Sequence, residues 1–167
     1  GRATATTSAL AATSRSASSS TTTTTPTTSS LSTTLASLEH APALIVFDLD
    51  NTLWTPELYQ IRQKNSPVAG RDISLFPGAL EILQFLADCQ NNEGSANPHP
   101  LKNTKLAIAS RTNKGAWAEQ LLMEFFVCLS SDDVTLSPIR DLFHHVEIYT
   151  GSKKKHFAAL KNAAGCT

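Results

Sequence analysis

The sequence lacks the features that mark several large classes of protein. Acidic and basic residues are equal in number, so the formal net charge of the 167-residue chain is zero. Proteins that bind nucleic acid or anionic membranes need clustered positive charge, which this balance does not indicate. No apolar run approaches the roughly 20 residues of a membrane-spanning helix. The three cysteines form no CxxC pair, which argues against a zinc site and a disulfide framework. We expect no nucleic-acid or membrane partner and, because no feature indicates self-association, a monomer.

The N-terminal part of the chain is poor in acidic and aromatic residues. Arg2 and Arg15 precede the first acidic residue, Glu39, in a segment made mostly of Ser, Thr and Ala. Such a segment cannot bury enough apolar surface to offset the entropy lost on ordering. It resembles an organelle transit peptide, and it equally fits plain low-complexity disorder. We therefore assign residues 1–40 to a leader and residues 41–167 to the domain, and expect a cytoplasmic protein or, with a transit peptide, a plastid or mitochondrial one.

Apolar strands and helices alternate after residue 40. Strands are predicted over 43–47, 105–110 and 145–150, and helices over 77–90, 114–126 and 153–165. Pro77 is placed to open the first helix and Gly165 to cap the last. Residues 130–143 predict a loop with a helical turn after Pro138. This order predicts an α/β fold with a parallel sheet and right-handed crossovers, in which ligands bind beyond the carboxyl ends of the strands.

Two acidic residues follow the first predicted strand. Asp48 and Asp50 are two positions apart, so on an extended chain their side chains point the same way. Their mutual repulsion is tolerable with a cation between them or with a shared proton. A hard cation such as Mg²⁺ fits, because it takes oxygen ligands and keeps waters. An EF-hand loop from Asp48 is excluded, because Leu53 and Tyr59 stand where Gly and Glu are required.

The other two predicted strands end in a hydroxyl and a lysine. Ser110, followed by Arg111 and Thr112, ends the second strand, and Lys153 follows the third. A hydroxyl can donate to a phosphoryl oxygen, and a lysine supplies positive charge to a phosphate. Acid, hydroxyl and ammonium at one sheet edge are the groups that phosphoryl transfer uses. A metal-binding DxD pattern also occurs in glycosyltransferases, but that alternative leaves Ser110 and Lys153 unexplained.

These motifs resemble those of the haloacid dehalogenase (HAD) superfamily of phosphohydrolases, and most of all its magnesium-dependent phosphatase family, also labelled acid phosphatase. The resemblance is carried in order by four stretches: "DLDNTLW", "LFPGALEIL", "IASRT" and "EIYTGSKKKHF". It spans residues 44–160. It implies a Rossmann-like HAD core in which residues 55–75 form a small flap in place of a large cap domain.

The resemblance also implies a role for each motif residue. Asp48 would be the nucleophile that forms an aspartyl-phosphate, and Asp50 would be the general acid and then the base for water. The Asp48 carboxylate and the Asp50 carbonyl would bind Mg²⁺. Ser110 would hold the phosphoryl group with Lys153, for which Lys154 is the fallback. Thr52 would brace the loop and Arg111 would contact the substrate. The expected substrates are small sugar or amine phosphates, phosphotyrosine-like esters, or a phosphoprotein.

One element of the family pattern is not found in the sequence. The family places a further strand ending in Asp-Asp about two dozen residues after the lysine, whereas Lys153 lies near the last residue given, Thr167. Asp132 and Asp133 lie before the third strand among loop-forming residues, so we interpret them as a loop or cap. We therefore expect an incomplete sheet. The alternative to a phosphatase is a truncated, inactive fragment with residual phosphate or metal binding.

Overall fold

The computed structural model describes residues 40–91, 98–130 and 135–165. The predicted leader, apart from its last residue, and the pair Asp132 and Asp133 lie outside the described residues. Among the described residues, no helix has both the length and the apolar character needed to span a bilayer.

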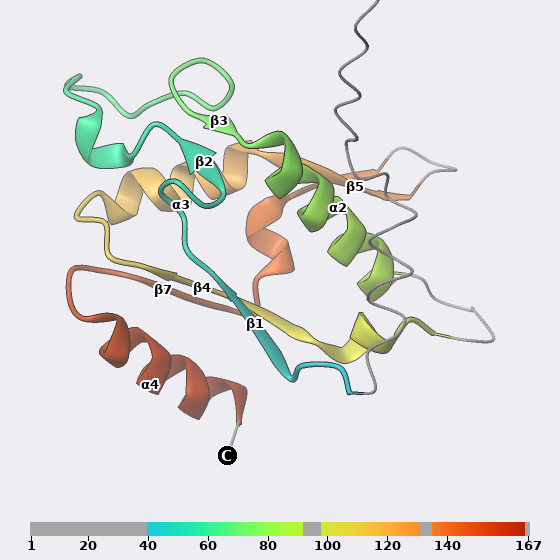
Figure 1. The fold of residues 1–167 in the computed structure, drawn as a ribbon. Helices are drawn as coiled ribbons and strands as arrows, with labels where there is room; N and C mark the ends of the chain where they lie inside the picture. Colours follow the sequence, from blue (N-terminus) through green and yellow to red (C-terminus); the bar gives the residue numbers. More distant parts are fainter. Residues whose placement is uncertain (1–39, 92–97, 131–134, 166–167) are drawn as a thin grey trace, which may run out of the picture.

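A parallel sheet forms the centre of the domain. Its strands are β1 (Leu44–Phe47), β4 (Lys105–Ser110) and β7 (His145–Ile148), in the order β1-β4-β7. Val46 pairs with Ala107, and Ile108 pairs with Val146. All three strands run in one direction, so their carboxyl ends meet at one edge, on the left in Figure 1. The predicted α/β class and all three predicted strands are confirmed.

Helices cover both faces of the sheet. In Figure 1, α2 (Pro77–Asn91) and α3 (Gly115–Glu124) lie on one side, and α4 (Lys153–Ala164) lies on the other. Strand β4 is buried on both faces. This double burial explains its continuous apolar sequence. Gly165 adopts a left-handed conformation after α4, with φ of 70°, which confirms the predicted C-cap.

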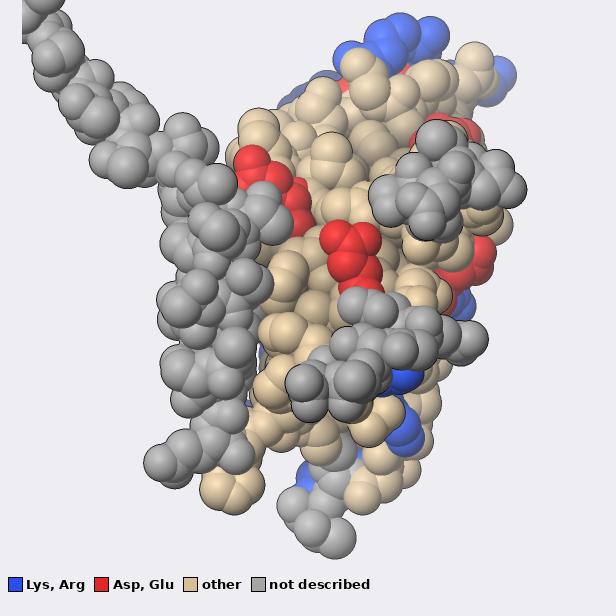
Figure 2. Space-filling model, turned by 90° about the vertical axis from the view of Figure 1, so that its right-hand side faces the viewer, with Lys and Arg blue, Asp and Glu red and all other residues tan. Residues whose placement is uncertain are grey.

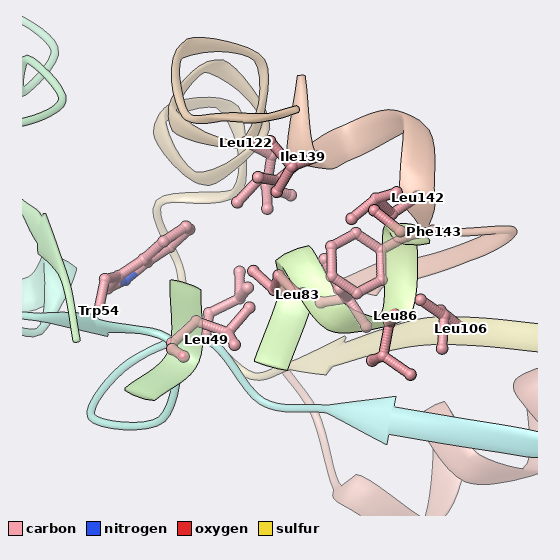
Figure 3. Packing of buried hydrophobic residues seen from close by; sticks show 14 of the residues in the cluster. Leu49, Trp54, Leu83, Leu86, Leu106, Leu122, Ile139, Leu142 and Phe143 are labelled. Atoms are coloured by element: carbon pink, nitrogen blue, oxygen red, sulfur yellow. The ribbon is translucent and has the colours of Figure 1, made fainter. Parts of the chain in front are cut away.

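Each face of the sheet carries its own core, because side chains alternate along β4. The two cores differ in size. Leu106 and Ile108 join the larger core beneath α2 and α3, whereas Ala107 and Ala109 pack with Leu160 of α4. Figure 3 shows that the larger core extends from the sheet to the 3₁₀ helix η3 (Ile139–Leu142). Its labelled side chains are Leu49, Trp54, Leu83, Leu86, Leu106, Leu122, Ile139, Leu142 and Phe143.

A small flap separates β1 from α2. It contains β2 (Trp54–Thr55), the 3₁₀ helix η1 (Leu58–Gln60) and β3 (Ser74–Leu75), and the two strands form an antiparallel pair. Buried Trp54, Leu58 and Ile73 anchor the flap in the main core. Figure 1 places it above the carboxyl end of β1, which agrees with the flap predicted over residues 55–75.

The segment after α3 differs from the sequence prediction. The helix predicted to residue 126 ends at Glu124, and the next residues form an antiparallel pair of β5 (Phe126–Ser130) with β6 (Thr135–Pro138). A side chain on α2 holds this pair, because Gln84 donates to the Cys128 carbonyl (2.6 Å) and accepts from the Cys128 N–H (2.8 Å). The helical turn predicted after Pro138 is confirmed as η3.

The side of the molecule at which the strands begin carries little charge. Figure 2 shows this side: uncharged residues predominate where described residues are visible, Asp and Glu form small separate groups, and Lys and Arg lie mainly at the upper and lower ends. A further 3₁₀ helix, η2 (Pro100–Asn103), leads into β4 at this end. Asp48, Asp50 and Arg111 lie at the opposite end of the sheet.

Candidate functional site

A cavity of about 420 Å³ opens at the carboxyl edge of the sheet. Polar residues from the ends of β1 and β4, from the turn after β7 and from the flap line it. They are Asp48, Asp50, Glu57, Tyr59, Ser110, Arg111, Thr112 and Gly151. The parallel sheet is the cause of this gathering, because the turns that leave its carboxyl ends all emerge at one edge.

Asp48 is paired with the predicted lysine. Its Oδ2 lies 2.9 Å from Lys153 Nζ, and its Oδ1 accepts a 2.9 Å hydrogen bond from the backbone N–H of Leu49. Lys153 Nζ also donates to the carbonyl of Ala109 on β4. Both side chains are half-buried. Lys153 thus contacts both Asp48, the residue that follows β1, and strand β4, whereas the fallback residue Lys154 is exposed.

Asp50 is held by the flap. Its Oδ1 accepts hydrogen bonds from Trp54 Nε1 (2.8 Å) and from the backbone N–H of Leu58 (3.3 Å). Burial raises the pKa of the Asp50 carboxyl above its ordinary value, and the nearby charges of Glu57 and Asp48 add to this rise. The two hydrogen bonds act in the opposite direction, since they stabilise the ionised form. A carboxyl with a raised pKa keeps its proton to higher pH, as a general acid requires.

A tight turn sets the position of Asp50. Asn51 has a positive φ of 56°, and its N–H donates to the Trp54 carbonyl at 2.9 Å. Asn is one of the few residues that tolerate this left-handed conformation. Thr52 is exposed, and its backbone N–H donates to the Leu49 carbonyl at 3.1 Å. The bracing role expected of Thr52 stays a prediction.

The end of β4 supplies the hydroxyl side of the cavity. Ser110 is 2% exposed and is the last residue of the strand. Its carbonyl accepts a 3.2 Å hydrogen bond from the Tyr149 N–H, which joins the ends of β4 and β7. Arg111 is exposed at the cavity, and Thr112 Oγ1 accepts from the Lys114 N–H at 3.2 Å ahead of α3.

Three lining residues were not singled out from the sequence. Glu57 and Tyr59 come from the flap, and Gly151 comes from the turn after β7. Asn51 Nδ2 donates to the Glu57 carboxylate, which links the acidic turn to the flap. The sequence predicted a flap at this place, but no pattern within it told which of its side chains face the cavity.

The oxygen donors at the cavity are of the kind that Mg²⁺ binds. Asp48 offers a half-buried carboxylate, and Mg²⁺ needs only one or two carboxylates when waters and substrate oxygens fill its other positions. Over the described ranges, no cluster of three or more His, Cys, Asp or Glu side chains could hold a metal ion. The Asp48 carboxylate at the cavity fits a cation that keeps most of its waters.

Comparison with known proteins agrees with this geometry. A family model described as Acid Phosphatase matches residues 40–167. A HAD-like hydrolase superfamily protein of Schizosaccharomyces pombe is 31% identical over 126 residues, which are 74% of this chain and 69% of that protein. Magnesium-dependent phosphatase 1 of Homo sapiens is 31% identical over 140 residues, covering 74% of this chain and 61% of its own length. This chain therefore belongs to the acid phosphatase family and is a phosphatase of the HAD type.

Proposed function

We propose that the protein hydrolyses phosphate monoesters with Mg²⁺, through an aspartyl-phosphate on Asp48. The observation that carries this proposal is the Asp48–Lys153 pair at a cavity that Asp50 and Ser110 also line. A carboxylate nucleophile beside an acid with a raised pKa matches the two roles that the reaction needs.

The reaction has two steps. A carboxylate oxygen of Asp48 attacks phosphorus, the bond from phosphorus to the ester oxygen breaks, and Asp50 donates its proton to the leaving oxygen. Asp50, now ionised, takes a proton from water, and the resulting hydroxide attacks the phosphorus of the acyl phosphate. The P–O bond to Asp48 breaks, inorganic phosphate leaves, and Asp50 is again protonated.

The remaining polar residues stabilise the phosphoryl group. Lys153 balances the negative charge of Asp48 and of the phosphoryl oxygens in the transition state. The buried Ser110 donates its hydroxyl to a phosphoryl oxygen, and Arg111 contacts the substrate at the mouth of the cavity. Thr52 keeps the Asp48–Asp50 turn in place through its backbone.

Magnesium would be held by the Asp48 carboxylate and the Asp50 backbone carbonyl, with waters completing its ligands. It supplies positive charge to the phosphoryl oxygens. The name of the human relative supports this cofactor.

The cavity favours substrates that are not enclosed by the protein. The flap is short, and Tyr59 is 64% exposed at the cavity. Small sugar or amine phosphates, phosphotyrosine-like esters and phosphorylated side chains of proteins could all reach Asp48.

Removal of divalent metal tests the proposal directly. We expect the full-length protein to release inorganic phosphate from an aryl phosphate in the presence of Mg²⁺. Chelation with EDTA should lower the rate at least 100-fold, because the phosphoryl charge then lacks its largest counter-charge. Readdition of Mg²⁺ should restore it. Phosphate binding without any release would favour the inactive alternative, and full activity in EDTA would exclude the cofactor.

A second prediction concerns the pH dependence of kcat/KM and follows from the hydrogen bond between Trp54 of the flap and Asp50. The hydrogen bond from Trp54 Nε1–H lowers the pKa of Asp50. Trp54→Phe removes this donor, so the pKa of Asp50 should be higher in the variant than in the wild type. Asp50 must be protonated in the first step, so the alkaline limb of kcat/KM should move to higher pH. The rate at the optimum should fall, since Asp50 also loses its anchor. Measured pH profiles of the wild type and the variant check this, and an unmoved or lowered alkaline limb would contradict it.

A further inference from the structure

A buried histidine in α4 is not used by the reaction described above. His156 has no exposed surface. Its Nδ1 lies 3.0 Å from the Ser152 carbonyl, and its Nε2 lies 3.1 Å from the Tyr149 carbonyl. Its ring also stacks on Tyr149, with centroids 4.2 Å apart and planes 19° apart. A carbonyl oxygen only accepts, so a neutral ring donates to one of the two and an imidazolium donates to both.

The two carbonyls lie at the ends of one turn. The turn, residues 149–152, connects β7 to α4 and includes Gly151, which lines the cavity. Two backbone bonds also restrain its ends, from Tyr149 N–H to the Ser110 carbonyl (3.2 Å) and from Lys155 N–H to the Ser152 carbonyl (2.9 Å). The His156 ring contacts the carbonyls at both ends and so bridges the turn.

The turn leads directly to Lys153. The ammonium of this residue contacts both Asp48 Oδ2 (2.9 Å) and the Ala109 carbonyl. A long, flexible side chain meets two partners at once only when its backbone is well placed. The Ser152 N-cap makes no side-chain hydrogen bond to α4, so the start of this helix lacks the usual anchor. The ring of His156 supplies one from inside the helix.

We propose that His156 is a positioning residue, which holds the turn 149–152 so that Lys153 meets Asp48. The expected effect on kcat rests on the proposed function. The expected effect on the turn does not depend on it. His156 touches neither substrate nor metal in this role and acts only through Lys153.

A substitution that keeps the ring separates anchoring from packing. His156→Phe retains an aromatic side chain against Tyr149 and removes both ring nitrogens, whereas His156→Gln retains an N–H donor. We expect His156→Phe to lower kcat roughly 10- to 100-fold with little change in KM, since small misplacement of a catalytic group has effects of that order. His156→Gln should recover part of this loss.

A double-mutant cycle with Lys153→Met tests the route of the effect. If His156 acts through Lys153, His156→Phe should change kcat less than about twofold once Lys153 is methionine, because the effects of coupled residues are not additive. A full 10- to 100-fold loss in both backgrounds would overturn the proposal. The matched control is Leu160→Ala, a buried change one turn later in α4, which should lower the unfolding temperature and leave kcat unchanged well below it.

Amide hydrogen exchange gives a readout that needs no turnover. His156→Phe should speed exchange in residues 149–155 and leave α2 unchanged, whereas Leu160→Ala should not speed exchange in residues 149–152. Unchanged exchange in residues 149–155 would overturn the proposal. If the wild-type protein released no phosphate from any monoester, the proposed function would fail, and exchange would still decide the role of His156.

Discussion

Asp48→Asn is expected to reduce phosphate release by a factor on the order of 10⁴ or more, because an amide cannot form the acyl phosphate. Asn has nearly the same shape as Asp, so the cavity and the turn of residues 49–54 should survive. The amide oxygen can still accept from the Leu49 N–H, whereas Lys153 loses its charged partner. The measurement is kcat for an aryl phosphate under saturating Mg²⁺.

The matched control is Asp88→Asn, an equal change of charge at an exposed position on α2. It should leave kcat within about twofold of the wild type, since ordinary surface substitutions have small effects. Acid quenching during turnover should trap phosphorus on the wild-type protein and none on Asp48→Asn. If Asp48→Asn kept more than a tenth of the wild-type rate, the nucleophile would have to be another residue.

The effect of Asp50→Asn is expected to depend on the leaving group. General acid catalysis contributes about 10²–10⁴-fold, and the contribution is largest when the leaving oxygen is basic. We therefore expect losses of that size for alkyl phosphates and a much smaller loss in the first step for nitrophenyl phosphate. Asn at this position can still accept the Trp54 hydrogen bond, so the flap should remain in place.

The second step also needs Asp50, because water must lose a proton to attack the acyl phosphate. Asp50→Asn should therefore release about one equivalent of nitrophenol in a burst and then turn over slowly, as expected for an accumulating covalent intermediate. Rapid-mixing kinetics measures this burst. Equal losses for alkyl and aryl phosphates, with no burst, would show that Asp50 is not the proton donor.

Much of the fold could be predicted because its elements carry strong local patterns. Residues 105–110 are mostly apolar because both faces of this strand are buried. Pro77 marks the start of α2, and Gly165 marks the end of α4. The pair β5–β6 could not be predicted in this way. Phe126–Ser130 continues the apolar character of α3, and the backbone there leaves the helix where it pairs with β6 and with Gln84 of α2.

The candidate site, too, could be predicted only in part. The sequence by itself determined that Asp48, Asp50, Ser110 and Lys153 follow the ends of three strands, since a parallel sheet brings such positions to one edge. Only the tertiary structure decided the contacts of these groups: Lys153 meets Asp48 and the Ala109 carbonyl, and Asp50 accepts a hydrogen bond from Trp54. It also decided that burial and the nearby charge of Glu57 raise the pKa of Asp50. The physical reason is that strand ends are set by local periodicity, whereas hydrogen bonds, burial and charge at the cavity depend on residues that only folding brings together.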